Sequence, residues 1–375
     1  MESSAKSFAA AAAAFLKKKD IEYSAKRYGI NALGAMAQGL FASLLIGTII
    51  STIGDQTGLQ LLVDTGNFAK AATGPAMAIS IGYALKCPPL VLFSLIAVGG
   101  AANTLGGAGG PLAVFVITVI TSELGKAVSK ETKIDIIVTP LVTIVSGVFL
   151  SMACAPAIGW AAFSAGAAVM WATGLQPFFM GILVSVIVGA ALTLPISSAA
   201  ICAALGLTGL AGGAAFAGCC AQMVGFAVMS FGENRWGGLF AQGLGTSMLQ
   251  MGNIVKNPRI WIPPTVVSAV AGPAATCVFG LRMNGPAVAS GMGTCGLVGP
   301  IGVYTGWLND IGAGAKAAVT ASDWFALITV CLVIPAVLTP LAALPLRRAG
   351  WIGKDDLKLD LMGDERYNEP CPRSK

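Results

Sequence analysis

No Asp, Glu, Lys, Arg or His occurs in the 97 residues between Asp135 and Glu233. A soluble domain carries about 25% charged residues, so an uncharged stretch of this length does not fit the surface of a soluble protein. One helical crossing of the roughly 30 Å hydrocarbon layer takes about 20 residues, so the stretch is long enough for several crossings. The sequence therefore predicts a protein embedded in a membrane.

The composition of the whole chain supports the same fold class. Hydrophobic residues make up 55% of the 375 residues, and charged residues make up 11%. This length allows about ten crossings, and we expect an all-α polytopic membrane protein with about 8–10 transmembrane helices. The basic residues stand at the ends of apolar segments, which is typical of membrane orientation signals and not of nucleic-acid binding.

The charge pattern divides the chain into three regions. Residues 1–30 carry most of their lysines after an apolar run, which predicts an amphipathic segment on the cytoplasmic membrane face and not a signal peptide. Residues 31–348 form the transmembrane domain, and residues 349–375 form a charged cytoplasmic tail of mobile surface. The excess of basic residues at the two ends places both termini in the cytoplasm of a bacterial-type inner membrane.

Glycine-rich segments interrupt the predicted spans at residues 99–111 and 285–302, and small polar residues do so after Pro195. Non-helical backbone at membrane depth is tolerated only where it is buried in protein or lines a wet cavity. We therefore expect re-entrant hairpins at these places. Spans are expected at residues 32–53, 68–85, 134–154, 178–194, 214–231, 261–281 and 324–346, with a weak amphipathic stretch at 160–173.

Two parts of the chain echo each other. Residues 74–82 and 272–280 both begin with Gly-Pro-Ala, and each is followed by a basic residue and a glycine segment that contains threonine. Secondary transporters are commonly built from two repeats whose broken helices meet at a binding site near the midplane. We favour an inverted repeat, and chance similarity in a chain rich in glycine and alanine is the alternative.

Several kinds of chemistry are excluded. The chain has no histidine, so it has no Ser-His-Asp or Cys-His arrangement and no phosphohistidine. The nine cysteines are scattered, mostly through apolar runs, without a CxxC pair, and we interpret them as small buried hydrophobic residues. No phosphate-binding loop, dinucleotide fingerprint or calcium loop occurs in a fitting context. We expect no catalytic residue, metal site or cofactor, which leaves transport of an uncharged polar solute.

Polar residues that interrupt apolar sequence are the candidates for a solute site. Glu233 and Asn234 lie in a deeply apolar context, where an ionisable residue indicates function by default, and the alternative is a solvated interfacial loop. Glycine segments expose backbone groups that, with amides and hydroxyls, suit a neutral polyhydroxyl ligand; the alternative is that they permit close helix packing. The expected substrate-binding residues are Asn103, Thr104, Ser197, Ser198, Glu233, Asn234, Thr246, Asn253 and Thr294.

Three long motifs carry a family resemblance. Residues 15–33 read FLKKKDIEYSAKRYGINAL, residues 243–264 read GLGTSMLQMGNIVKNPRIWIPP, and residues 284–304 read NGPAVASGMGTCGLVGPIGVY. The chain resembles a membrane family related to the sugar-translocating enzyme IIC subunits of the bacterial phosphotransferase system, which includes perfringolysin O regulator-type proteins. The resemblance implies a lipid-embedded homodimer that moves sugar across the membrane, with phosphorylation supplied by a separate enzyme IIB.

We therefore expect a permease that translocates a sugar or a similar neutral polar solute by alternating access. The chain shows no recognisable IIB or IIA domain, so phosphorylation of the solute would need a partner chain, and the sequence leaves open whether the protein acts as an enzyme. Two alternatives stay open. One is a membrane sensor that binds a solute and reports to a regulator, and the other is an ion- or proton-coupled symporter that works without phosphorylation.

Overall fold

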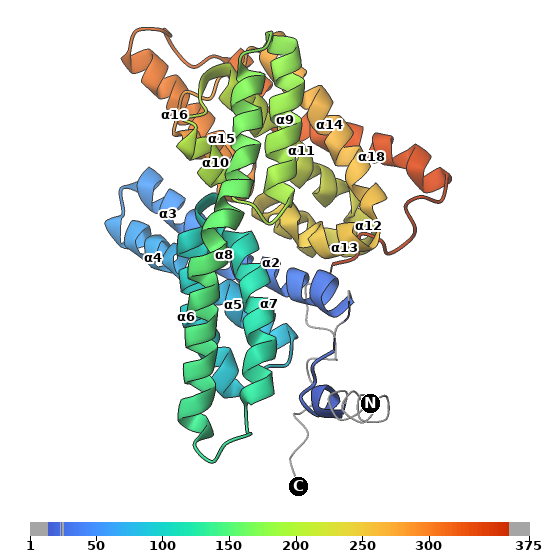
Figure 1. Cartoon of the computed structure of the whole chain (residues 1–375). Coiled ribbons are helices and arrows are strands. Elements are labelled where there is room, and N and C mark those ends of the chain that lie inside the picture. Colours follow the sequence, from blue (N-terminus) through green and yellow to red (C-terminus); the bar gives the residue numbers. More distant parts are fainter. Residues whose placement is uncertain (1–13, 23, 25, 360–375) are drawn as a thin grey trace.

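The computed structural model describes residues 14–22, 24 and 26–359 (Figure 1). Within these ranges every regular element is a helix, apart from one isolated β-bridge between Gly209 and Met283. The protein is thus an all-α polytopic membrane protein, as predicted. Six described helical stretches are long and apolar enough to cross a membrane: Arg27–Thr57, Pro89–Val128, Asp135–Thr173, Gly209–Met229, Pro258–Val278 and Ala321–Arg348, with Pro177–Thr193 as a shorter apolar helix.

The first third of the chain forms the lower part of Figure 1 together with the start of α8. Its helices pack around a core of aliphatic side chains, which includes Met77, Ile81 and Leu95. A three-residue turn, η3 (Gly107–Gly109), folds the apolar stretch Pro89–Val128 back on itself, because Gly107 has a φ of +50°, which favours glycine. The helices are α2 (Leu33–Leu40), α3 (Ile46–Thr57), α4 (Gln60–Ala71), α5 (Thr73–Ala84), α6 (Pro89–Gly106) and α7 (Gly110–Val128).

One helix connects the lower and upper parts of the molecule. Helix α8 (Asp135–Thr173) has 39 residues and runs through both parts in Figure 1, with a length of about 58 Å. The expected span at 134–154 and the expected weak stretch at 160–173 therefore belong to one continuous helix. Pro140 and Pro156 do not end the helix, because each removes only one backbone hydrogen bond and the chain on both sides stays apolar.

The upper part of the molecule is built around α11 (Gly209–Met229), which is almost entirely buried. Helices α9 (Pro177–Thr193), α14 (Ile262–Pro273) and α18 (Ile334–Arg348) pack against it. Small residues permit this close approach: a Cβ on Gly218 would lie 1.9 Å from the Ser185 carbonyl oxygen. The glycines of this span are therefore required for helix packing.

Short helices fill the breaks between the long ones. Helix α10 (Ser198–Ala204) lies between α9 and α11, and α15 (Ala287–Ser290) with η8 (Cys295–Leu297) lies between α14 and α16 (Val298–Gly312). Residues 231–261 also form short pieces in place of one long helix. These pieces are α12 (Phe231–Phe240), η4 (Ala241–Gly245), η5 (Ser247–Gln250), α13 (Met251–Lys256) and η6 (Pro258–Trp261), and α17 (Ala321–Ile328) precedes α18.

The described part of the N-terminal segment docks on the end of α7. The Nζ atom of Lys126 donates to the carbonyl oxygen of Asp20 at 2.9 Å and lies 2.7 Å from Glu123, and both charged side chains are largely buried. Burial opposes the ionisation of Asp20, but its hydrogen bond with Arg27 and the charge of Arg27 hold the pKa of Asp20 below its usual value. The first thirteen residues of the predicted amphipathic segment lie outside the described residues.

The interpretation of the cysteines as buried residues is confirmed in part. Cys202, Cys219, Cys220, Cys295 and Cys331 are buried, and all are free thiols. Cys154 and Cys277 are exposed at the surface of their helices, where the interpretation is wrong. An apolar sequence context does not distinguish the core-facing side of a membrane helix from its outer side, because both sides are apolar.

The packing of α11 predicts a stability difference between two glycine substitutions. Gly218→Ala places a methyl group against the backbone of α9, so we expect it to destabilise the protein by about 1–3 kcal/mol. Gly34→Ala in α2 is the matched control, since nothing lies within 4 Å of its added Cβ, and it should be neutral or stabilise by up to about 1 kcal/mol. Melting temperatures of the detergent-purified variants test this packing, and equal values would contradict it.

Candidate functional site

Three breaks in the helices come together beside α11. The backbone N–H of Ser197 donates to the carbonyl oxygen of Ala108 in η3 at 2.9 Å. The hydroxyl of Ser198 donates to the carbonyl oxygen of Gly291 at 2.7 Å, next to α15. The predicted hairpins are far apart in the sequence, and the structure brings them into direct contact.

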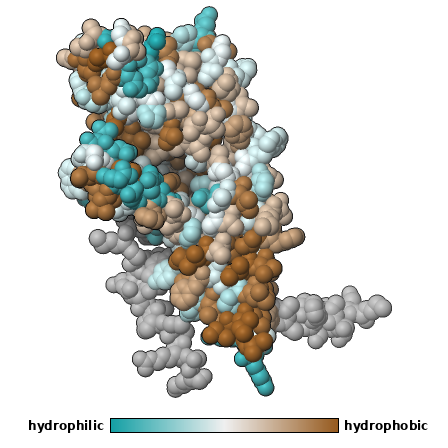
Figure 2. All heavy atoms as spheres, turned by 90° about the vertical axis from the view of Figure 1, so that its left-hand side faces the viewer, coloured by the Kyte–Doolittle hydropathy of each residue, from teal (hydrophilic) through white to brown (hydrophobic). Residues whose placement is uncertain are grey.

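A cavity lies between α3 and the turn that precedes α16. Its volume is about 300 Å³, and the face viewed in Figure 2 is hollowed between these two elements. The hydroxyl of Thr294 bonds the carbonyl oxygen of Gly243 just outside the cavity, but none of the predicted site residues lines it. The lining is mostly aliphatic and offers few hydrogen-bonding groups: Ile49, Thr52, Ile53, Gln56, Thr57, Leu244, Gly296, Leu297 and Ile301.

A buried polar network lies in the centre of the upper part. Gln222 of α11 is fully buried, and its Oε1 accepts from Trp261 Nε1 at 2.9 Å and from Thr193 Oγ1 at 3.2 Å. Its Nε2 donates to Ser268 Oγ at 3.3 Å. The hydroxyl oxygens of Thr193 and Ser247 lie 2.8 Å apart. Neutral side chains therefore link α9, α11, α14 and η5.

A second set of buried amides continues from this network. Gln242 Nε2 donates to Ser230 Oγ at 2.9 Å, and Gln250 Nε2 donates to Gln242 Oε1 at 2.9 Å. Asn253 Nδ2 then donates to Gln250 Oε1 at 2.8 Å. We call Asn234, Gln242, Gln250 and Asn253 the amide row. The row adjoins the Gln222 network because Ser247 and Gln250 share the short helix η5.

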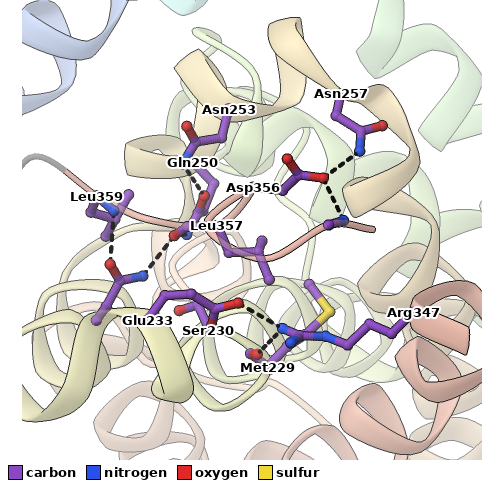
Figure 3. Close-up of polar contacts among 12 residues, drawn as sticks. Met229, Ser230, Glu233, Gln250, Asn253, Asn257, Arg347, Asp356, Leu357 and Leu359 are labelled. Carbon is purple, nitrogen blue, oxygen red and sulfur yellow. Dashed lines mark hydrogen bonds and ion pairs between the residues drawn. The ribbon is translucent and has the colours of Figure 1, made fainter. Parts of the chain in front are cut away.

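The segment 351–359, which we call the strap, crosses the amide row. The carbonyl oxygen of Leu357 accepts from Asn234 Nδ2 at 2.7 Å and from Gln250 Nε2 at 3.0 Å (Figure 3). The backbone N–H of Leu359 donates to Asn234 Oδ1 at 2.7 Å, and Asn253 Nδ2 donates to the Lys358 carbonyl oxygen at 2.9 Å. Three of the four amides thus bind main-chain atoms of the strap.

The strap is also anchored by apolar side chains. Ile352 and Leu357 are buried in a cluster with Phe226 and Ile254. The prediction of a mobile surface tail is therefore wrong for residues 351–359, because these two aliphatic side chains and the amide contacts attach them to the body of the protein. Residues 360–375 lie outside the described part of the chain.

Glu233 lies next to the amide row and is partly neutralised. Its Oε1 lies 3.1 Å from Arg347 Nη2, and this guanidinium also donates to the carbonyl oxygen of Met229 at 3.0 Å (Figure 3). The side chain of Glu233 is only 6% exposed, and its Oε2 is buried without a hydrogen-bond partner among the described residues. A buried acceptor without a partner costs free energy, so this oxygen is available to a ligand.

The backbone at Arg235 is unusual. It has a φ of +52° inside α12, a conformation that side chains other than glycine adopt rarely and at a cost of about 1–3 kcal/mol. The turn breaks the helical path directly after Glu233 and Asn234. Strain of this kind persists only where the surrounding contacts hold it, and here Asn234 is fixed by two hydrogen bonds to the strap.

The predicted site residues do not form one site. Glu233, Asn234 and Asn253 lie together at the strap, whereas Ser197, Ser198 and Thr294 lie at the meeting hairpins. Thr246 lies between these two groups and caps η5 by accepting from Met248 N at 3.2 Å, and Ser197 caps α10 in the same way. Asn103 and Thr104 lie in the last turn of α6, just before η3. Thr104 is exposed, and its hydroxyl donates to Gly100 within its own helix.

Sequence reasoning missed the glutamines. Gln222, Gln242 and Gln250 are fully buried, although glutamine is usually exposed. A signal was present for Gln222, which is the one amide side chain in the long apolar helix α11. Gln242 and Gln250 lie in or beside the motif at 243–264, so their presence in a family-specific segment was a second usable signal.

A family comparison supports the class of protein. Residues 30–359 match the family model described as Phosphotransferase system, EIIC. The chain belongs to this family. No curated protein and no solved structure matches the chain at a significant level. As an EIIC-family member with several apolar helices, it is a multi-pass membrane transporter of the phosphotransferase permease type.

The Gln222 network of this EIIC-family protein yields a stability prediction. Gln222→Met keeps the side-chain length but leaves the indole N–H of Trp261 without this partner, at about 1–3 kcal/mol, whereas the hydroxyl of Thr193 keeps its contact with Ser247. Gln60→Met on the exposed side of α4 is the matched control and should change stability by no more than about 0.5 kcal/mol. Thermal unfolding in detergent measures both, and an unchanged Gln222→Met would show that the network does not stabilise the fold.

Proposed function

We propose that this EIIC-family protein translocates a sugar or a similar neutral polar solute that binds at the amide row and Glu233. The observation that supports this proposal most directly is the composition of the buried site. It consists of amides and hydroxyls in an otherwise apolar interior, together with one carboxylate oxygen that has no hydrogen-bond partner in the described part of the chain. Such a site can bind a ligand through many directional hydrogen bonds without a net charge.

The polar atoms of this site suit a polyhydroxyl solute. The amide nitrogens of Asn234, Gln250 and Asn253 are donors, and Asn234 Oδ1 and Glu233 Oε2 are acceptors. A hydroxyl group both donates and accepts, so a sugar can use both kinds of atom. A charged solute would find fewer groups to pair with, since the carboxylate of Glu233 already pairs with Arg347.

Alternating access is the mechanism that we propose for the translocation. The lower and upper parts of the molecule meet at the helix breaks, for example through the single bond from Ser197 to Ala108, and the neighbouring breaks of the upper part meet through the bond from Ser198 to Gly291. Few hydrogen bonds have to break when these helix breaks move relative to each other. The cavity between α3 and the turn before α16 supplies space for this movement.

The energy source and assembly follow from the family as proposals. Enzyme IIB as a separate chain would phosphorylate the sugar after its passage, and a homodimer would be the working unit. Arg347 and Arg348 at the end of α18 favour a cytoplasmic position for that end of the chain. The amide row and the strap would then open toward the cytoplasm.

Ligand-dependent thermal stabilisation tests the function. A panel of sugars, polyols and their phosphates is added to the detergent-purified protein, because a ligand that binds only the folded state raises its stability by mass action. We expect a neutral sugar or polyol to stabilise the protein. Glu233→Gln should weaken that binding about tenfold or more, because a charge-assisted hydrogen bond contributes about 1.5–3 kcal/mol.

Glu131→Gln is the control for this substitution, since Glu131 is a partly exposed carboxylate that pairs with Lys19 far along the chain from the site. It should leave solute binding unchanged. Uptake into vesicles then separates the possible functions. Saturable uptake supports the permease, binding without uptake supports a sensor, and uptake that collapses with an ionophore supports a symporter. A flat panel together with no uptake would overturn the sugar proposal.

A further inference from the structure

We propose that the strap is an internal competitor of the solute, so that its release from the amide row opens the binding site. This inference rests on the proposed function, because it concerns the same side chains. The strap presents two carbonyl oxygens and one N–H to the amide row, at Leu357, Lys358 and Leu359. These atoms accept and donate hydrogen bonds as the hydroxyl groups of a sugar would.

The contacts of the strap explain why it would leave the amide row only in exchange for another hydrogen-bonding group. Gln250 and Asn253 are buried and Asn234 is partly buried, and each loses a hydrogen bond when the strap leaves. A buried amide group without a partner costs about 1–3 kcal/mol. The strap can therefore leave only when another group with donors and acceptors takes its place. Water can do this weakly, and a bound polyhydroxyl solute can do it with several groups at once.

The strap has two separately held parts. In the first part, Asn257 Nδ2 donates to Asp356 Oδ2 at 2.8 Å (Figure 3). It also donates to the Trp351 carbonyl oxygen at 2.9 Å. The guanidinium of Arg259 also lies 5.1 Å from the centre of the Trp351 ring. None of these contacts involves the amide row. Residues 351–356 can therefore stay attached while residues 357–359 leave.

The backbone supplies a bending point between the two parts. Asp355 has a φ of +71°, in the left-handed region, and Asp356 accepts from the backbone N–H of Gly353 at 2.7 Å. This tight turn aims the chain at the amide row. Because residues 351–356 stay attached, they keep the competing atoms of residues 357–359 close to the amide row at a high local concentration. Rebinding of the strap would therefore be fast whenever the solute leaves.

Competition has a quantitative consequence. When the strap covers the site, the apparent dissociation constant for the solute equals the intrinsic constant divided by the fraction of molecules with an open site. Loosening the strap raises this fraction and therefore tightens apparent binding. A strap that only stabilised the fold would have the opposite effect or none, since its loss would not free any solute-binding atom.

Two substitutions loosen the strap without changing a residue of the amide row. Leu357→Ala removes most of a fully buried anchor. Leu359→Pro removes the N–H that donates to Asn234 Oδ1, and Leu359→Ala is its matched control because it keeps that N–H. We expect at least tenfold tighter apparent binding in the first two variants and no comparable change in the control. The probes are glucose, mannitol and maltose, titrated by thermal stabilisation of the full chain.

Limited trypsin digestion supplies a second readout that does not depend on melting. Lys354 and Lys358 are exposed cleavage points within the strap. In the wild type, a bound probe should increase cleavage at Lys358, and Leu357→Ala should show fast cleavage there without any probe. Cleavage at Lys130 and Lys133, in the exposed connection between α7 and α8, reports general loosening and should stay constant.

The outcomes separate this inference from the proposed function. Equal solute affinity in the wild type and in both loosened variants, with no change in cleavage at Lys358, would overturn the competition and leave the solute site standing. Binding that appears only in the loosened variants would support both proposals. No binding of any probe in any variant, even with a rapidly cleaved strap, would overturn the sugar site and the competition together.

Discussion

Hydrogen bonding inside an apolar interior is the constraint on which this structure depends. A polar group in hydrocarbon or in a dry core cannot form a hydrogen bond with water, so its hydrogen-bond partner has to come from the protein itself. Gln222 illustrates the result, since its carbonyl oxygen and its amide nitrogen are both used by side chains from neighbouring helices. The same requirement holds at the helix breaks, where Ser198 and Thr294 bond carbonyl oxygens of other segments.

Small residues make these internal bonds reachable. Helices α9 and α11 approach so closely at Gly218 that a methyl group would not fit, and α9 and α14 meet in the same manner at Gly181 and Gly272. Between membrane helices, close backbone packing replaces the hydrophobic drive that stabilises soluble cores, because lipid is as apolar as the side chains. Glycine therefore serves two purposes in this chain. It permits the hairpin turns, and it brings polar side chains within hydrogen-bonding distance.

The candidate site follows from the same need for hydrogen-bond partners. The amide row leaves donors that the helices cannot satisfy, and the strap satisfies them with main-chain atoms. Glu233 is different, because one of its oxygens pairs with Arg347 while the other has no partner among the described residues. A site whose partners come from a separate, tethered segment can exchange them for those of a ligand. A site satisfied within the helices could not do so without distorting the fold.

Much of the architecture was predictable from the sequence, because the apolar spans and the glycine breaks are local properties. The uncharged stretch after Asp135 indicated several membrane helices, and the glycines at 99–111 and 285–302 marked real breaks. The continuity of α8 through Pro156 was not predictable, because it depends on neighbours that support the helix on both sides of the proline.

The site was predictable only in part. Glu233, Asn234 and Asn253 stood out as polar residues in apolar sequence, whereas Gln222, Gln242 and Gln250 became recognisable only through their burial. The contact between the strap and Asn234 joins residues more than 120 positions apart. The sequence by itself thus determined that the chain crosses a membrane and where its glycine-rich breaks lie, since hydrophobicity and backbone freedom act locally. Only the tertiary structure decided which polar groups meet, because a hydrogen bond depends on where two distant segments lie in space.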